Sequence, residues 1–187
     1  MSSNEYEIAR ATKLLEKCSA MSLLCAKSTS YWNFIKMCFQ MPLILISSAM
    51  CILNSFDNNN GNMKIPNVVV NGVSVLVLAL QNNLKVIEKV ETFKNLSNQF
   101  RTLANSIECC SNFDNITNNS FMEKYDNLIQ QCPFEAISEK HKNQVIESFK
   151  GKHLPLQLNS NMITDLKLNS QIVNANIELS NNAENNI

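Results

Sequence analysis

Two stretches without a charged residue decide the fold: MCFQMPLILISSAMCILNSF over residues 37–56 and IPNVVVNGVSVLVLALQNNL over residues 65–84. A helix rises about 1.5 Å per residue, so each stretch would be about 30 Å long, which matches the hydrocarbon thickness of a bilayer. The connector between them, residues 57–64, is short and polar, so two helices joined by it must run antiparallel. We predict a transmembrane helical hairpin, and the alternative is a helical hairpin buried in a soluble bundle.

The composition favours helices over strands. The 187 residues include only 3 Gly and 4 Pro, which is few for a fold built from many turns, and we therefore expect an all-α protein. Charged residues make up 17%, against about 25% in an ordinary soluble domain. The 16 Lys and Arg balance the 16 Asp and Glu. We expect no nucleic-acid partner, because binding to phosphates needs an excess of cations on one face.

The cations flanking the two stretches predict an orientation. Lys27 and Lys36 precede the first stretch, and Lys85, Lys89, Lys94 and Arg101 follow the second, whereas the connector carries only Lys64. By the positive-inside rule both termini are predicted to be cytosolic, with residues 57–64 outside.

Prolines and apolar spacing predict where the helices begin, bend and pack. Pro42 lies one turn into the first stretch, so the helix should kink or restart there. No Gly or Pro lies between Gly72 and Cys110, so the second span should continue without a break. Beyond it, apolar residues recur every three or four positions and should form a seam against an amphipathic N-terminal helix. The main seam residues are Phe93, Phe100, Leu103 and Ile107.

The rest of the chain is predicted to hold shorter helices. Ser120 and Glu123 have capping-box spacing, which predicts a helix start, and Pro133 should start another helix that ends at Gly151. The predicted segments are an amphipathic N-terminal helix (1–36), transmembrane helix 1 (37–56), the hairpin loop (57–64), transmembrane helix 2 (65–84), its helical extension (85–110), short helices (111–153) and an Asn-rich tail (154–187).

Uncharged polar side chains interrupt both apolar stretches. They are Gln40, Ser47, Asn67, Asn71, Ser74 and Gln81. In lipid such groups must face protein or water. They either hold the hairpin and a homo-oligomer together or line a water-filled path.

The sequence offers little for catalysis. The seven cysteines include no CxxC or CxH spacing, and the only histidines are His141 and His153. Cys132 and His141 could be imagined as a thiol–imidazole pair, but no third orienting group is evident, and His141 lies among charged residues expected to face solvent. We expect no enzyme activity, no metal site and no cofactor.

The layout resembles a known family. An amphipathic helix ends near YWNFIK at residues 31–36, two close spans follow, and a charged-apolar helix begins with KVIEKVETFK at residues 85–94. This arrangement resembles the SLATT group of two-transmembrane domains over about residues 5–110. The resemblance implies an oligomeric, pore-forming membrane effector. The bias toward Asn, Lys and Ile also resembles large DNA viruses with AT-rich genomes. From the residues themselves we expect a two-pass membrane protein with a structural or scaffolding role, for example in a virion membrane, with protein partners on its cytosolic face. The pore-forming effector is the alternative.

Overall fold

The computed structural model describes residues 3–56, 64–110 and 115–158. Every regular element in these ranges is helical, so the predicted all-α class is confirmed. The elements are α1 (Ser3–Phe56), α2 (Lys64–Asn83), α3 (Val86–Glu108), α4 (Asn115–Gln130), the 3-10 helix η1 (Phe134–Ala136), α5 (Glu139–Ser148) and the 3-10 helix η2 (Leu156–Leu158). The predictions for loop residues 57–63 and for the tail from residue 159 lie outside the described residues.

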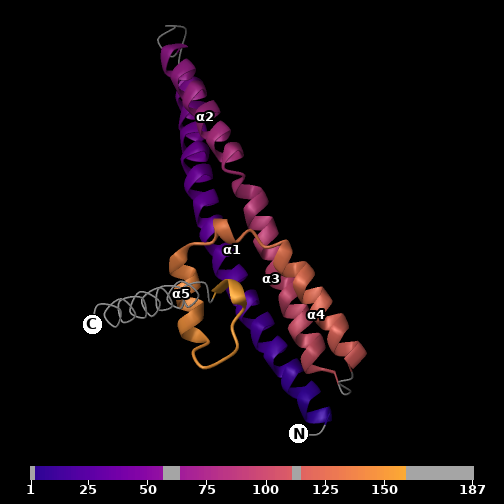
Figure 1. Ribbon diagram of the computed structural model, residues 1–187. Coiled ribbons are helices and arrows are strands. Elements are labelled where there is room, and N and C mark those ends of the chain that lie inside the picture. The colour runs from indigo at the N-terminus through magenta and orange to yellow at the C-terminus, as the bar shows by residue number, and fades with distance from the viewer. Residues whose placement is uncertain (1–2, 57–63, 111–114, 159–187) are drawn as a thin grey trace, which may run out of the picture.

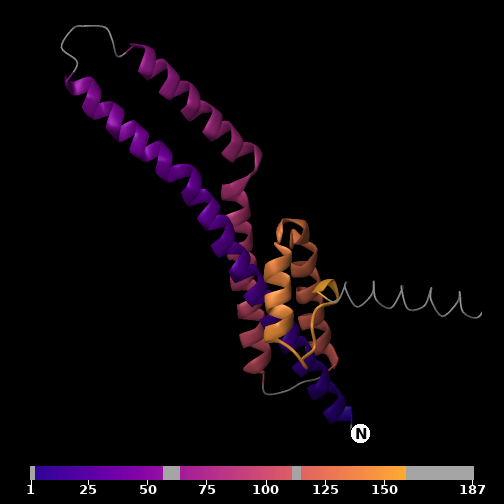
Figure 2. The same cartoon turned by 90° about the vertical axis from the view of Figure 1, so that its left-hand side faces the viewer.

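The molecule is elongated and has two parts along the length of α1 (Figure 1). Residues 37–56 of α1 run beside α2 at one end, and we call these two segments the apolar hairpin. Residues 3–36 of α1 pack with α3, α4 and α5 at the other end, and we call this part the bundle (Figure 2). The apolar hairpin therefore projects beyond the bundle as a separate arm.

Helix α1 is one continuous element of 54 residues, and Pro42 lies inside it. The expectation of a restart at this proline is wrong, and Figure 2 shows a gentle curve in α1 instead. A proline removes one backbone hydrogen bond and pushes its ring toward the carbonyl four residues earlier, here that of Cys38. Both Pro42 and Cys38 are exposed, so the helix can bend here without disturbing a packed neighbour.

Helices α2 and α3 are separate, which corrects the prediction of one uninterrupted helix. Helix α2 ends at Asn83 and α3 begins at Val86, with Lys85 between them in the left-handed region at φ 50° and ψ 40°. No Gly or Pro marks this position in the sequence. The signals that usually reveal a helix end were therefore missing.

The core of the bundle forms between α1 and α3. Phe93, Phe100 and Ile107 on α3 are each at most 1% exposed. They belong to the same cluster as Cys18, Met21, Leu24 and Cys25 of α1. Where the helices cross, Ser22 Oγ donates to the Ser97 carbonyl at 3.1 Å and Ser97 Oγ donates to the Ser22 carbonyl at 3.0 Å. The small side chains and their two hydrogen bonds fix the register of the crossing.

Helices α4 and α5 cover this core from the side. The Tyr125 ring of α4 meets the Phe100 ring edge-on at a centroid distance of 6.0 Å. Val145 of α5 is fully buried in the same cluster. The Asn118 side chain also donates to a Glu7 carboxylate oxygen at 2.6 Å, which ties the first turn of α4 to α1.

Two predicted helix starts in this region are wrong. Helix α4 begins at Asn115, so Ser120 is an interior residue and not its N-cap. Pro133 precedes only the three-residue η1, and α5 starts later, with Ser138 as its N-cap. Burial of Asn118 and Phe121 against the core favours the longer α4. The tertiary contact thus overrides the local capping signal.

Replacing Phe100 by Ala should destabilise the bundle by about 3–5 kcal/mol, the usual cost of removing a buried aromatic ring. Phe100 is 0% exposed and contacts Tyr125, so the cavity would lie in the centre of the core. Thermal unfolding followed by circular dichroism measures the change. The control is Thr102→Ala, an exposed position on the same helix that should shift stability by no more than about 0.5 kcal/mol. Equal effects from the two variants would contradict the packing described.

Candidate functional site

The surface of the apolar hairpin is the most unusual feature of the molecule. Two helical stretches are long and apolar enough to cross a membrane, and none of the most apolar window of the first and only 11% of that of the second is buried. Large apolar side chains that remain exposed lie on both arms of the hairpin: Met37, Met41, Ile44, Leu45, Ile46, Ile52, Val68, Val69, Val73, Val75, Leu76, Leu78 and Leu80. A patch of this extent on one protein marks a surface that is covered from outside.

The exposure of the hairpin argues against the alternative in which the hairpin is buried in a soluble bundle of its own chain. The described part of the chain packs its own bundle and lays none of that bundle over the hairpin (Figures 1 and 2). If the hairpin is shielded from water, lipid, another protein or another copy must shield it. The described residues do not bury it themselves.

The polar side chains predicted to lie within the hairpin do not form one buried cluster. Gln81 is buried, at 4% exposed, while Asn71 and Ser47 are exposed and Gln40 and Ser74 are half-buried. The side chain of Asn67 lies outside the described ones. The chain thus shields Gln81 but leaves Asn71 and Ser47 on the outer surface of the hairpin.

Serine hydroxyls in the hairpin are satisfied within their own helices. Ser74 Oγ donates to the Val70 carbonyl at 2.8 Å, and Ser48 Oγ donates to the Ile44 carbonyl at 2.7 Å. A serine in a helix can always make this bond to the preceding turn, which lowers its cost in an apolar environment. Ser74 therefore needs no partner from another chain, whereas an amide such as Asn71 cannot satisfy all its donors and acceptors in this way.

The break at Lys85 is a structural feature that the sequence did not reveal. The Leu84 amide donates to Leu80 O and the Lys85 amide to Asn82 O, and the next helix opens with the Lys89 amide donating to Lys85 O, all at 3.0 Å. The first amides of α3 have no partner within the helix, and no side chain caps them. Unpartnered amides of this kind need water.

An open cavity lies at the break, where Ile87 and Glu88 are exposed and Val86 is fully buried. Its volume is about 330 Å³, and it is lined by Gln81, Asn82, Lys85, Val86, Ile87, Glu88 and Glu91. Lys85 and Glu88, which form an ion pair at 3.4 Å, are both largely exposed. The surroundings of the hairpin therefore change from apolar to polar within about one helical turn.

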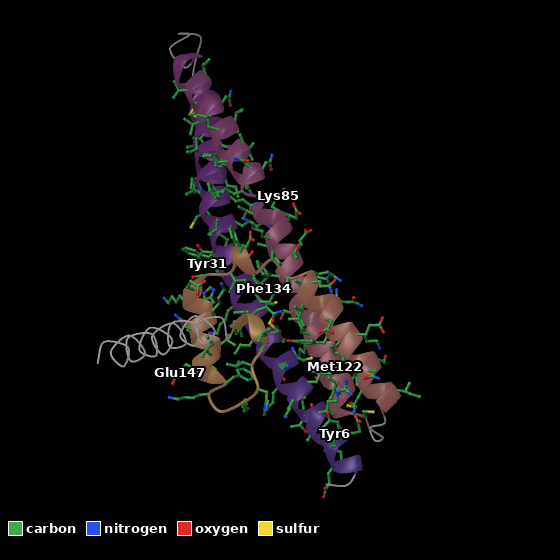
Figure 3. The ribbon with its side chains drawn as sticks, viewed as in Figure 1. Tyr6, Tyr31, Lys85, Met122, Phe134 and Glu147 are labelled. Carbon is green, nitrogen blue, oxygen red and sulfur yellow. The ribbon has the colours of Figure 1, made fainter. Side chains whose placement is uncertain are left out.

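A group of aromatic side chains lies on the bundle side of the break, and Figure 3 labels Tyr31 from this group, farther from the tip of the hairpin than Lys85. Trp32 Nε1 donates to the Ala136 carbonyl at 3.0 Å, and Lys89 Nζ lies 4.2 Å from the centroid of the Trp32 ring. The Tyr31 ring meets both Trp32 and His141 edge-on at 5.6 Å. This group, which we call the collar, joins α1, α3, η1 and α5 through one indole hydrogen bond, one cation–ring contact and edge-on ring contacts.

His141 is half-buried in the collar, so its predicted place on a solvated face is wrong. Its Nδ1 atom is buried and has no hydrogen-bond partner. Burial, with smaller effects from Lys27 and Lys140, holds the pKa of His141 below its usual value. The thiol–imidazole pair imagined from the sequence gains no support, because Cys132 lies in the core cluster with Cys25 as its neighbour.

The remaining shifted groups act in packing. Burial raises the pKa of Cys18 to about 12, and it also raises the pKa of Tyr125. The backbone amide of His153 donates to Glu16 Oε2 at 2.8 Å and holds the pKa of that carboxyl below its usual value. Among the described residues, no three His, Cys, Asp or Glu side chains gather closely enough to hold a metal ion.

The comparisons with known proteins give no relative. No protein-family model matches the chain, and no curated protein or solved structure is significantly similar to it.

Substitution of Lys85 by Gly and by Ala should separate a true break from a continuous helix. A left-handed backbone costs an L-residue roughly 1–2 kcal/mol, a cost that Gly avoids, so Lys85→Gly should be the more stable of the two by about 1 kcal/mol. Both variants lose the ion pair to Glu88, so that loss cancels in the comparison. In an uninterrupted helix Ala would be the more stable by about 1 kcal/mol, which reverses the sign. Thermal unfolding of the two variants side by side decides between them.

Proposed function

We propose that this chain is a two-pass integral membrane protein with a scaffolding role, whose apolar hairpin crosses the bilayer and whose bundle stands on the cytosolic side. The observation that carries the proposal is the uncovered apolar surface of the hairpin beside a bundle that packs its own core. Two features favour lipid over a protein partner as the cover: the length of the hairpin and the way it ends.

The length of the hairpin fits a bilayer. Helix α2 has 20 residues, so it is about 30 Å long, which is the thickness of the hydrocarbon core. It carries no charged side chain after Lys64. Exposed apolar residues lie on several sides of α2, including the consecutive pairs Val68–Val69 and Val75–Leu76. Consecutive residues point in different directions, as expected for a helix surrounded by lipid and not for one docked through a single stripe.

The base of the hairpin fits the membrane–water interface. Unpartnered amides are too costly for the hydrocarbon region, so the break at Lys85 belongs in the headgroup layer or in water. The collar lies about one helical turn away on the bundle side, because Lys89, four residues after Lys85, contacts the Trp32 ring. Amphipathic rings and lysines are enriched at this depth. Lys36 and Lys85 add cations on the bundle side, which supports a cytosolic bundle.

A scaffolding role is supported by what the bundle offers outside the membrane. An open groove of about 450 Å³ runs between α3 and α4, and its lining is dominated by amides, hydroxyls and one cation: Asn98, Gln99, Thr102, Leu103, Ser106, Lys124, Asn127, Leu128 and Gln131. Interfaces between proteins mix apolar and polar area in this way. A pore-forming effector would conduct ions in a planar bilayer, whereas a scaffold would co-purify with a partner or a particle and conduct nothing.

Labelling with a membrane-impermeant thiol reagent tests the proposal. The protein should resist extraction from membranes by alkaline carbonate and dissolve only in detergent. In a background with all seven native cysteines replaced by Ala, a cysteine introduced by Asn59→Cys should react in intact cells. A second background that keeps only the native Cys109, exposed at the end of α3, should react only after the membrane is opened.

The labelling outcomes separate the parts of the proposal. The reverse pattern would overturn the orientation. Labelling of both positions in intact cells would overturn the membrane span, as would a protein that remains monodisperse in buffer without detergent.

We also propose that the protein is a homo-oligomer in the membrane. Asn71 and Ser47 are exposed on the hairpin, and an amide facing lipid without a partner costs several kcal/mol. Further copies of the hairpin can supply that partner, as polar side chains commonly do between transmembrane helices. Gln81 is already buried by its own chain and contributes less.

Asn71→Leu should shift a chemical cross-linking ladder in mild detergent toward smaller species, because it removes the exposed amide. The matched control is Asn82→Leu, the same substitution at an exposed position beside the open cavity at the break. The control should leave the ladder unchanged. A parent protein that is monomeric, or equal ladders for all three proteins, would contradict the oligomer.

A further inference from the structure

Two thiols from distant parts of the chain meet inside the bundle. Cys25 lies on α1 and is 0% exposed, and Cys132 follows α4 and is 7% exposed. Both are free thiols that belong to the same core cluster, and Cys132 is the neighbour that most affects Cys25. Each therefore has the other as a neighbour that could form a covalent bond with it.

Of the two thiols, Cys132 is the one that borders an open cavity. It lines an open cavity of about 520 Å³ together with Lys89, Pro133, Phe134, Glu135 and Ala136. Its backbone is held in place, because its amide donates to the Ile129 carbonyl at 3.1 Å and its carbonyl accepts from the Phe134 amide at 2.9 Å. A small oxidant that enters this cavity can therefore meet the Cys132 sulfur.

Cys25 has the opposite character. It is fully buried, and the neighbouring Cys132 thiol, together with burial, raises the pKa of Cys25. It therefore stays protonated and does not meet an external oxidant first. A thiol in that position can act only on a neighbour that has already been oxidised.

We propose that Cys132 and Cys25 form a redox modification site, in which a small hydroperoxide oxidises Cys132 through the open cavity and Cys25 then closes a disulfide. The inference stands on the bundle alone and is independent of the proposed membrane function.

The chemistry balances in two steps. The Cys132 thiolate attacks the terminal OH oxygen of the hydroperoxide ROOH, the O–O bond breaks, and RO⁻ leaves as Cys132 becomes a sulfenic acid. RO⁻ then takes a proton from water to give ROH. The Cys25 sulfur next attacks the Cys132 sulfur and displaces hydroxide, which takes the Cys25 proton and leaves as water. The two thiols lose two electrons in total, and the hydroperoxide gains them.

The disulfide would change how the bundle is held together. Cys25 lies in the middle of the bundle segment of α1, and Cys132 lies in the connection from α4 to η1. That connection leads to the collar, where the Ala136 carbonyl accepts from Trp32. A covalent bond between these cysteines would tie the connection to α1, so the oxidised protein should unfold at a higher temperature than the reduced protein.

The test uses the full chain, purified under reducing conditions and then exposed to hydrogen peroxide with and without the sulfenic-acid reagent dimedone. Peptide mapping should show a linkage between Cys25 and Cys132 in the wild type. In Cys25→Ser, dimedone should label Cys132 several-fold more than in the wild type, because the sulfenic acid can no longer be consumed. The matched control is Cys18→Ser, the same change at another fully buried cysteine of α1, which should behave as the wild type.

Two results would overturn the proposal. One is the absence of a Cys25–Cys132 linkage in the folded protein at a peroxide dose that oxidises the exposed Cys109. The other is dimedone labelling of Cys132 that Cys25→Ser does not change. If Cys25→Ser fails to fold, the wild type is oxidised in native buffer and in urea. The Cys25–Cys132 linkage should predominate over other cysteine pairs in native buffer and should lose this preference in urea.

Discussion

Helices α1 and α3 bury their apolar faces against each other along the bundle, and this antiparallel contact positions every other part of the molecule. Phe93, Phe100 and Met21 are fully buried within it, and the paired hydrogen bonds of Ser22 and Ser97 set its register. Because α1 continues beyond the contact and α2 returns to it, the hairpin must project from one end of the bundle (Figure 1). Helices α4 and α5 then close the remaining sides of the core.

The contact between α1 and α3 also explains why the hairpin and the bundle have different surfaces. In the bundle the apolar residues face a partner helix, and polar residues face outward. On the hairpin side of Lys85, no further element of the described chain packs against α1 and α2. Their apolar residues therefore remain on the surface. The change coincides with the backbone break, its unpartnered amides and the collar around Trp32. Under the membrane proposal, these three features together place the lipid boundary at Lys85.

The parts of the fold that follow periodic rules could be predicted from the sequence. The low content of Gly and Pro predicted helices. Apolar residues spaced by three and four positions identified the seam, and the structure buries its main members: Phe93, Phe100, Leu103 and Ile107. Lys85 could not be found, because a lysine in the left-handed region carries no local signal. The start of α4 was missed because contacts of Asn118 and Phe121 with the core outweigh the capping pattern at Ser120. The meeting of Cys25 and Cys132 depends on tertiary packing alone. Among the polar hairpin residues, the sequence could not tell that Gln81 is buried while Asn71 is exposed.

Hydrogen exchange of the protein in lipid nanodiscs tests the central claim most directly. If lipid covers the hairpin, amides in residues 43–56 and in α2 should exchange slowly, as should those of α3 in the bundle core. The amides of Ile87 and Glu88 should exchange fast, because they lie in the first turn of α3 and their residues are exposed to water. Fast exchange throughout the hairpin would show that lipid does not cover it. Slow exchange across residues 84–88 would show that the two helices are continuous and that the boundary does not lie at Lys85.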